Sequence, residues 1–256
     1  MRSFDYIESG KTLLTPHTTS LLAAIHEAKG RQSIQTTIRP DILGTLVAVA
    51  RIQSTDASNR IEGISTSDSR LNDLVSEKVT PRNRNEEEIA GYRDALSVIH
   101  ESHDYIPITP NVILQLHRDL FRHTPLTFAG HFKDSDNVII ERDAHGTSTV
   151  RFAPPSALVT PELIERACSA YTQAIRDGHT DPLLAIAMFI LDFTCIHPFN
   201  DGNGRMSRLL TLLMLCRNGY MVGKYISIEH LIEQSKSTYY EALAASTQGW
   251  DDNAND

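Results

Sequence analysis

The sequence predicts an all-α protein that carries one small β-hairpin. Apolar residues recur at helical spacing through most of the chain. Two of these segments open with a Thr-Pro pair, a common helix start, and only one stretch, residues 136–155, shows β-prone runs around a polar turn. With 41% hydrophobic and 22% charged residues among 256, the chain can bury a substantial core, as one large domain or two small ones.

Composition and charge limit the classes of partner. The formal net charge of −8 gives no electrostatic footprint for nucleic acid, and no window reaches the ~18 apolar residues of a membrane span. The N-terminus has no apolar run of signal-peptide length. Three widely spaced cysteines are expected to be reduced core thiols. These features predict a cytoplasmic protein that binds neither nucleic acid nor a membrane.

Three helices are predicted in the first half of the chain. Residues 41–54 have a start signal and continuous apolar content. Asn85 is predicted to cap a second helix, because Glu86–Glu88 follow in the first turn, where acidic side chains suit the helix dipole. Thr109 and Pro110 would open a third helix as its cap and its first residue.

The second half contains further predicted helices. Thr160 and Pro161 repeat the cap-and-proline start. Residues 181–196 are apolar nearly all round, which indicates a buried central helix. Helical segments also follow Asn203 and extend over residues 231–245.

The stretch at residues 136–155 breaks the helical pattern. Two β-prone runs, Val138–Ile140 and Thr149–Phe152, flank a polar turn at Arg142–Gly146. Because an isolated hairpin is only marginally stable, this one is expected either to pack against the helical body or to stay mobile for use.

The chain is predicted to divide into residues 1–84, 85–250 and 251–256. The stretch VTPRNRNEEE is the expected loop between the N-terminal helical part and the main body. The polar C-terminal stretch follows the only tryptophan, Trp250. Two interpretations of this end stay open, an ordinary disordered tail or an end that once packed against further chain.

The stretch CIHPFNDGNGRMSRLL, residues 195–210, concentrates reactive residue types at a predicted helix start. Pro198 disfavours helical backbone at His197, and Gly202 and Gly204 let the backbone turn tightly and approach a ligand. The next helix therefore begins beside this loop. Its free N–H groups and its dipole favour an anion at that position.

The charged side chains at this helix start suit a polyphosphate. Arg205 and Arg208 lie three residues apart, so both are expected to point toward one volume. Two guanidinium groups match a polyphosphate better than a single carboxylate. Asp201 is suited to a Mg²⁺ ion that bridges two phosphates, and His197 is the candidate general base.

The sequence HPFNDGNGRMSR resembles the motif of the Fic family at every fixed position, and the resemblance extends over most of the chain from about residue 41. It implies a Fic-type helical bundle in which the β-hairpin is a flap. It also implies a protein adenylyltransferase, a nucleotidyltransferase that moves AMP from ATP to a Ser, Thr or Tyr hydroxyl of a target protein or of itself. The implied cofactors and partners are ATP, Mg²⁺ or Mn²⁺, an unidentified target protein that docks on the flap and, as an open alternative, a second copy of the chain in a homodimer.

The resemblance assigns roles by position. His197 would be the base, Phe199 the core anchor of the loop and Asp201 the metal ligand. The implied nucleotide contacts are Asp201, Gly202, Asn203, Gly204, Arg205, Met206, Ser207 and Arg208. The flap would cover the nucleotide and clamp the target by strand addition, through Val138, Ile139, Ile140 and Glu141. Tyr239 and Tyr240 resemble residues that line the ribose and adenine pocket, with simple packing as the open alternative, and Thr247 stands where some relatives have an asparagine.

The sequence SNRIEG at residues 58–63 resembles an inhibitory pattern of the same family, Ser/Thr-x-x-x-Glu-Gly/Asn. The resemblance implies that Ser58, Glu62 and Gly63 belong to an N-terminal inhibitory helix. Glu62 would pair with Arg208 and misalign the phosphates of ATP for in-line attack. Relatives of this type usually continue into a small winged-helix-like domain, so such a C-terminal domain is expected to be missing here.

Two further functions stay open. The same site could remove AMP from modified proteins or transfer another group in a phosphodiester-type reaction, although the intact Gly204 favours AMP transfer. A catalytically silent regulatory binding module is the third alternative. The intact His197 and Asp201 argue against it.

Overall fold

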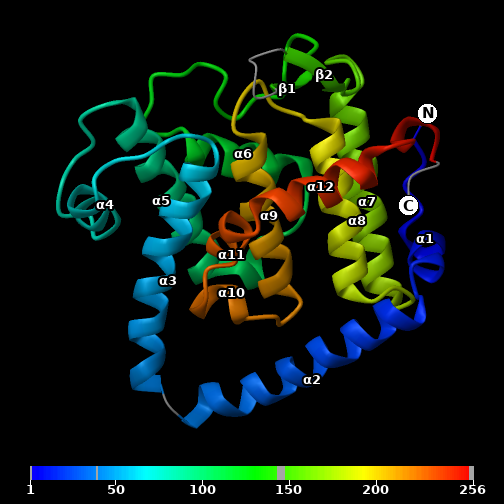
Figure 1. Ribbon diagram of the computed structural model, residues 1–256, viewed down its shortest axis with the longest axis horizontal. Helices are drawn as coiled ribbons and strands as arrows, with labels where there is room; N and C mark the ends of the chain where they lie inside the picture. Colours follow the sequence, from blue (N-terminus) through cyan, green and yellow to red (C-terminus); the bar gives the residue numbers. More distant parts are fainter. Residues whose placement is uncertain (1, 39, 143–147, 254–256) are drawn as a thin grey trace.

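The computed structural model describes residues 2–38, 40–142 and 148–253, without the side chains of residues 33–41, 140–149 and 177. As predicted, the described chain is mainly helical and contains one two-stranded sheet. Figure 1 shows the helices arranged around α9. The elements in chain order are α1 Tyr6–Thr12, α2 Pro16–Ile38, α3 Pro40–Ile61, α4 Asp68–Val75, α5 Arg84–Ser102, η1 His103–Tyr105, α6 Pro110–Leu120, β1 Ile139–Arg142, β2 Ser148–Phe152, α7 Thr160–Asp177, α8 Pro182–Ile196, α9 Asn203–Arg217, α10 Val222–Tyr225, α11 Ile228–Gln234, α12 Lys236–Thr247 and η2 Trp250–Asp252.

The main core lies where α8 and α9 pack against each other and against α5 and α7. α8 is apolar around most of its circumference and buries Phe189 and Phe193 completely, which confirms the predicted central helix. Each such ring contributes about 1.5–3 kcal/mol by leaving water. All three cysteines are buried free thiols, as expected. Among the described helices, none combines the length and the apolar character that crossing a membrane requires.

Capping side chains explain where several helices begin. Thr109 accepts a hydrogen bond from the Val112 amide, and Pro110 is the first residue of α6, which confirms this predicted start. At α8, Asp181 accepts from the Leu183 amide in the same way. Both caps satisfy an amide that has no partner within its own helix.

Two other predicted caps are wrong. Asn83, and not Asn85, caps α5, because its side chain reaches the Glu86 amide three residues on. Thr160 lies inside α7, where its hydroxyl donates to the Ser156 carbonyl instead of accepting from an amide. A turn before α7 supplies that carbonyl and moves the helix start upstream.

The predicted helix over residues 231–245 is in fact two helices. α11 begins earlier, at Ile228, with Ser227 as its cap, and it ends at Gln234. Ser235 has non-helical backbone angles, φ −104° and ψ 26°, although its amide and its hydroxyl both donate to the Leu231 carbonyl. α12 therefore starts afresh at Lys236 and takes a different direction (Figure 1).

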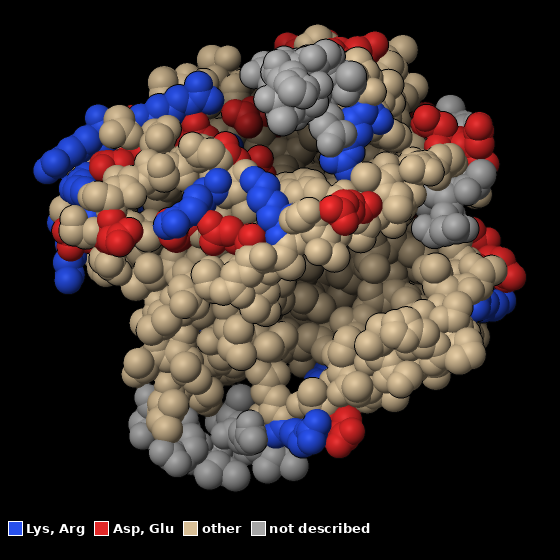
Figure 2. Space-filling model, viewed as in Figure 1, with Lys and Arg blue, Asp and Glu red and all other residues tan. Residues whose placement is uncertain are grey.

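The N-terminal helices wrap around this core. α1 packs on α7 and α8, α2 crosses below the body, and α3 rises on the opposite side against α5, α10 and α11 (Figure 1). His26 of α2 binds Asp181 (Nε2–Oδ2, 2.6 Å), and Lys29 donates to the Asn218 carbonyl. Figure 2 shows charged side chains gathered over the upper part of this face, whereas the part below carries few. α2 thus connects α1 with α3 and is held to the body by the contacts of His26 and Lys29.

Both ends of the described chain meet at Asp192, a fully buried residue of α8. The Trp250 indole N–H donates to its carboxylate at 2.6 Å, and the Tyr6 hydroxyl donates at 2.7 Å. Arg2 forms an ion pair with the same carboxylate at 3.0 Å. Trp250 is thus a core residue, because a buried carboxylate requires its donor. Of the residues that follow it, 254–256 lie outside the described part of the chain.

The predicted hairpin is present as the antiparallel pair β1 and β2. Ile140 lies opposite Val150, and a bulge separates Ile139 from Ile140. At the base of the hairpin, Phe152 contacts the Trp250 ring edge-on, with ring centroids 6.1 Å apart. The hairpin is therefore packed down at its base. Of the predicted turn at Arg142–Gly146, residues 143–147 lie outside the described part of the chain.

Candidate active site

A cavity of about 240 Å³ lies where the end of α8, the start of α9, the flap and α12 meet. Among the predicted site residues, those that line it are Glu62, Ile139, His197, Asn203, Gly204, Ser207, Arg208, Tyr239 and Tyr240, together with Thr247. The described residues absent from its lining are Ser58, Gly63, Val138, Asp201, Gly202, Arg205 and Met206. The side chains of Ile140 and Glu141 lie outside the described part of the structure.

The loop that carries His197 is held by asparagine side chains. His197 ends α8 with left-handed backbone angles, φ 49° and ψ 62°. Asn203 accepts from the Phe199 amide at 2.9 Å and donates to the Phe199 carbonyl at 2.7 Å. From outside the loop, Asn137 donates to the carbonyls of His197 (3.3 Å) and Phe199 (3.2 Å). These bonds stabilise a backbone conformation that a non-glycine residue rarely adopts.

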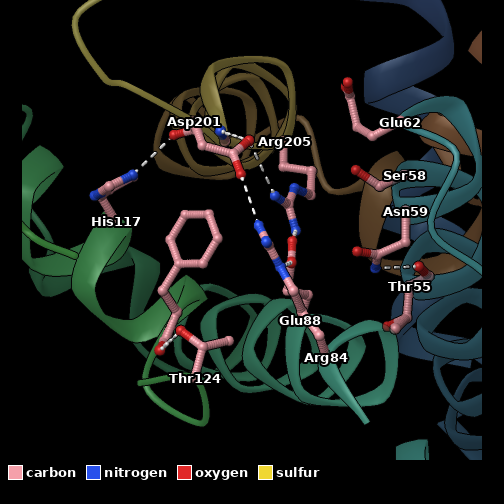
Figure 3. Close-up of polar contacts among 12 residues, drawn as sticks. Thr55, Ser58, Asn59, Glu62, Arg84, Glu88, His117, Thr124, Asp201 and Arg205 are labelled. Atoms are coloured by element: carbon pink, nitrogen blue, oxygen red, sulfur yellow. Dashed lines mark hydrogen bonds and ion pairs between the residues drawn. The ribbon is translucent and has the colours of Figure 1, made fainter. Parts of the chain in front are cut away.

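Phe199 anchors the loop in the core. Its ring is fully buried and stacks on His117 of α6, with centroids 3.7 Å apart and parallel planes. The Gly130 amide donates to Nδ1 of His117, so Nε2 carries the proton and donates to the Asp201 carbonyl at 3.0 Å (Figure 3). Burial lowers the pKa of His117 to about 4, which keeps this ring neutral.

Lys133 also holds the loop, although no motif or spacing in the sequence singles it out. Its side chain is buried and donates to the Ile196 carbonyl at 3.1 Å and to Asn137 at 2.9 Å. Burial lowers the pKa of Lys133 to about 8. In the sequence, Lys133 lies in a polar stretch before the β-prone run, and such a stretch indicates only a turn.

The start of α9 faces the cavity. Gly202 precedes the helix with φ 82°, and a Cβ there would lie 2.8 Å from the Phe121 ring, so this position requires glycine. The first backbone bond inside the helix runs from the Met206 amide to the Gly202 carbonyl. The amides before Met206 therefore have no partner within the helix and form the positive end of its dipole.

The Glu62 carboxylate lies directly over this helix start. A Cβ placed on Gly204 would come 2.2 Å from Glu62 Oε1. The same oxygen accepts from Arg208 Nη2 at 2.7 Å, while Ser58 accepts from Arg208 through its hydroxyl at 2.8 Å and its carbonyl at 2.9 Å. An anionic group already occupies the position where the sequence predicted an anion.

Gly63 explains why Glu62 has this position. Gly63 has φ 79°, its amide bonds to the Arg60 carbonyl, and the Ile64 amide bonds to the Asn59 carbonyl. This pair of bonds is a Schellman closure, which ends α3 at Ile61 and makes Glu62 its C-cap residue. A carboxylate at a helix C-terminus is unfavourable by itself, so its contact with Arg208 and with the start of α9 compensates.

Arg205 and Arg208 do not point toward one volume, and this expectation is wrong. The Arg205 side chain is 1% exposed and donates to Glu88 of α5 at 2.6 Å, away from Glu62 (Figure 3). Its guanidinium also lies 5.0 Å from the centre of the Phe121 ring. Two residues three apart share a helix face only near the backbone, and the buried Glu88 carboxylate draws this long side chain away.

Asp201 belongs to the same charged group as Arg205. Its carboxylate lies 3.4 Å from Arg84 and 3.7 Å from Arg205, and its side chain is 44% exposed. Within the described part of the chain, no three His, Cys, Asp or Glu side chains gather into a metal site. A single exposed carboxylate suits Mg²⁺ when phosphate oxygens and water supply the other ligands. The residues therefore fit a metal that arrives with a nucleotide.

His197 is on the cavity wall as an unprotonated imidazole. Burial, aided by the positive charge of Lys133, lowers the pKa of His197 to about 4. Above that pH the ring is neutral and can accept a proton. The wall opposite is aromatic, since Tyr239 and Tyr240 of α12 meet edge-on with centroids 5.5 Å apart.

Arg151 of the flap also lines the cavity and was missed by the sequence analysis. Its guanidinium donates to the Tyr240 carbonyl at 3.0 Å, so it connects β2 with α12. Phe152, Thr194, Cys195 and Leu243 complete the wall. The residues around Arg151 show only β propensity, and β propensity does not predict the contacts of a long side chain.

Comparison with known proteins identifies the fold and the motif. Residues 107–215 match the Fic/DOC family. A Fido domain-containing protein of Dictyostelium discoideum is 37% identical over 90 residues, which cover 34% of this chain and 58% of that protein. A protein adenylyltransferase Fic of Nematostella vectensis is 24% identical over 202 residues, or 75% of this chain and 42% of that protein. The chain thus spans about half the length of these curated relatives.

A solved structure confirms the arrangement of the helices. A Fic domain-containing signaling protein of Bacteroides thetaiotaomicron superposes with a TM-score of 0.73 at 24% identity, over 88% of this chain and 81% of the other. The matched residues 107–215 contain the whole loop from His197 to Arg208. Residues 107–215, with the whole motif, are thus similar to the Fic/DOC family, and the arrangement of the helices is the all-α Fic fold.

Proposed function

We propose that this protein transfers AMP from ATP to a Ser, Thr or Tyr hydroxyl of a target protein. The observation that carries the proposal is the carboxylate of Glu62 on Arg208 and over the start of α9, because a site that holds one anion this way has the chemistry to bind a phosphate. Relatives named protein adenylyltransferases support the reaction. The aromatic wall of Tyr239 and Tyr240 provides room for the adenosine.

In the proposed reaction, His197 removes the proton from the target hydroxyl. The hydroxyl oxygen then attacks the α-phosphorus of ATP, a new P–O bond forms, and the bond from that phosphorus to the bridging oxygen breaks, so pyrophosphate leaves. The free amides of α9 and the Arg208 guanidinium would stabilise the charge on the phosphates. Asp201 would hold Mg²⁺, which neutralises phosphate charge when it is bound.

We further propose that Glu62 inhibits this reaction in the resting protein. As long as its carboxylate holds Arg208 at 2.7 Å, that guanidinium is not free to bind a phosphate. The side chain is one-third exposed, so it can move aside without unpacking α3. The edge of the flap remains the predicted docking position for the target. A homodimer, a cytoplasmic location and the use of Mn²⁺ are likewise predictions.

Removal of AMP from a modified protein is a second candidate. Glu62 favours it, because a carboxylate on the wall that also holds His197 could orient a water molecule toward a phosphodiester. Release of AMP from a previously adenylylated sample would identify this activity. The two reactions are distinguished by measuring both the attachment of labelled AMP to protein and the release of labelled AMP from it.

The deciding experiment compares ATP labelled at the α- or the γ-phosphorus, with the parent protein, Glu62→Gly and Glu62→Gly/His197→Ala. We expect label from the α position alone, at least tenfold more in Glu62→Gly than in the parent, and none in the double variant. Glu233→Gln is the matched control, since Glu233 pairs with Arg60 of α3 outside the cavity. Label from the γ position would contradict AMP transfer. Equal labelling of Glu62→Gly and parent would contradict the inhibitory role.

A further inference from the structure

The cavity contains three charged side chains from the described part of the chain, Glu62, Arg151 and Arg208. Glu62 and Arg208 neutralise each other at 2.7 Å. Arg151 has no carboxylate within ion-pair distance among the described residues, and its one hydrogen bond goes to the Tyr240 carbonyl. It is therefore the cation of the cavity that no carboxylate among the described side chains balances.

A guanidinium has five N–H donors in a planar fork, which matches phosphate oxygens in pairs. One bond to a carbonyl leaves most of these donors of Arg151 available. The side chain is only half-exposed, so water compensates its charge less than at an open surface. An anion that enters the cavity would gain two charge-assisted hydrogen bonds there.

The backbone that carries Arg151 is fixed before any ligand arrives. The next residue, Phe152, packs edge-on against the buried Trp250, whose indole is bonded to Asp192. The bond to Tyr240 of α12 holds the guanidinium on the cavity wall. A cation placed in this way binds an anion with a smaller entropy loss than a mobile surface arginine.

We propose that Arg151 is a phosphate-binding residue of the nucleotide site. This inference rests on the proposed function. It also depends on Arg205, because the guanidinium of Arg205 forms an ion pair with Glu88 outside the cavity. The triphosphate then meets one guanidinium from α9 and a second one from the flap. The flap contributes to nucleotide binding through a charge as well as through its strand edge.

The test is calorimetric titration of adenosine, AMP and ATP into the Glu62→Gly protein and into further variants of it. Arg151→Gln is expected to weaken AMP and ATP binding about tenfold or more, the loss of one to two charge-assisted hydrogen bonds, and to leave adenosine binding unchanged. Arg151→Lys should recover part of that loss. Arg217→Gln is the matched control, because Arg217 also donates only to backbone carbonyls, those of His103 and Asp104, but outside the cavity.

Three results would overturn the inference. Equal weakening of all three ligands would make Arg151 a structural connection between β2 and α12. Unchanged ATP binding with reduced transfer to a target would place Arg151 at the target instead. Unchanged binding and transfer would remove any role. Arg208→Ala reports on the proposed function separately: if that variant binds ATP as well as its parent, or if no variant binds ATP, the nucleotide site itself is refuted and this inference with it.

Discussion

At the scale of single residues, burial rather than a charged partner sets the protonation state of His197, the proposed base. Many catalytic histidines are oriented by a carboxylate, which raises their pKa. Here desolvation and the nearby Lys133 disfavour the imidazolium, so the pKa of His197 falls to about 4. The base is weaker than an ordinary histidine but is unprotonated throughout the physiological pH range.

The pH dependence of self-labelling in Glu62→Gly should reflect this low pKa. Because only the neutral ring accepts a proton, the rate should stay constant from pH 8 down to about 5 and fall as the pH approaches 4. Removing Glu62, whose charge raises the pKa, does not move the fall upward. Initial rates with α-labelled ATP measure the profile. A half-maximal rate near pH 6.5, the ordinary value for histidine, would contradict it.

The contacts of Glu62, Arg205 and Arg151 differ in how far the sequence could predict them. The contact between Glu62 and Arg208 was implied by a short motif, and the structure places the two side chains together. The direction of Arg205 was not predictable, because it depends on Glu88, which lies on another helix 117 positions away in the chain. Arg151 was missed for the same reason, since its partner belongs to α12. Spacing within a helix predicts local neighbours and not the choice among distant partners.

At the scale of elements, the loop between α8 and α9 depends on the segment before β1. Lys133 and Asn137 come from that segment and bind carbonyls of Ile196, His197 and Phe199. The position of His197, the proposed base, is therefore coupled to the root of the flap. A rearrangement of the flap root would alter the geometry of the base.

Asn137→Ala tests this connection. The substitution removes two donors to loop carbonyls and the acceptor for Lys133, so the free energy of unfolding should fall by about 1–2 kcal/mol. Self-labelling of the Glu62→Gly protein should fall as well, because the base loses its orientation. Urea unfolding and labelling rates are the measurements. Asn200→Ala is the stability control, since Asn200 makes one exposed hydrogen bond, to Asp134. Equal stability losses in the two variants would argue against the connection.

Helix types and the hairpin could be predicted from periodicity, but several boundaries could not. Asn83 and Asn85 have equal capping propensity, and the choice between them follows from which side chain reaches the Glu86 amide. The break at Ser235 lies in its backbone angles, which leave no mark in the apolar pattern. Alternative helix boundaries of this kind differ in free energy by only a few tenths of a kcal/mol to about 1 kcal/mol.

At the scale of the whole molecule, the buried Asp192 connects α8 to the distant segments that carry Tyr6 and Trp250. Burial raises its pKa, and the bonds from Arg2, Tyr6 and Trp250 counteract that rise. No sequence pattern predicts this contact, because the partners are separated from α8 by 58 to 190 residues. The charge is tolerated only because its partners are in place.

Trp250→Phe should therefore destabilise the protein although it keeps the aromatic packing. It removes the indole donor from Asp192, and we expect a loss of about 1–3 kcal/mol in the free energy of unfolding, measured with urea. Tyr6→Phe should have a similar effect, and the double variant should deviate from additivity, since both donors serve one carboxylate. Tyr105→Phe, at an 88% exposed position, is the control. A Trp250→Phe protein as stable as its parent would show that the indole bond contributes nothing.

The meeting of the two ends at Asp192 has a consequence for how the molecule opens. The amide of Ser3 also donates to the Asn253 side chain at 2.7 Å, so the described chain closes nearly into a ring. Release of Tyr6 or Trp250 would leave a buried carboxylate of α8 without one of its donors. Local opening of either segment is therefore coupled to α8 and to the loop that follows it.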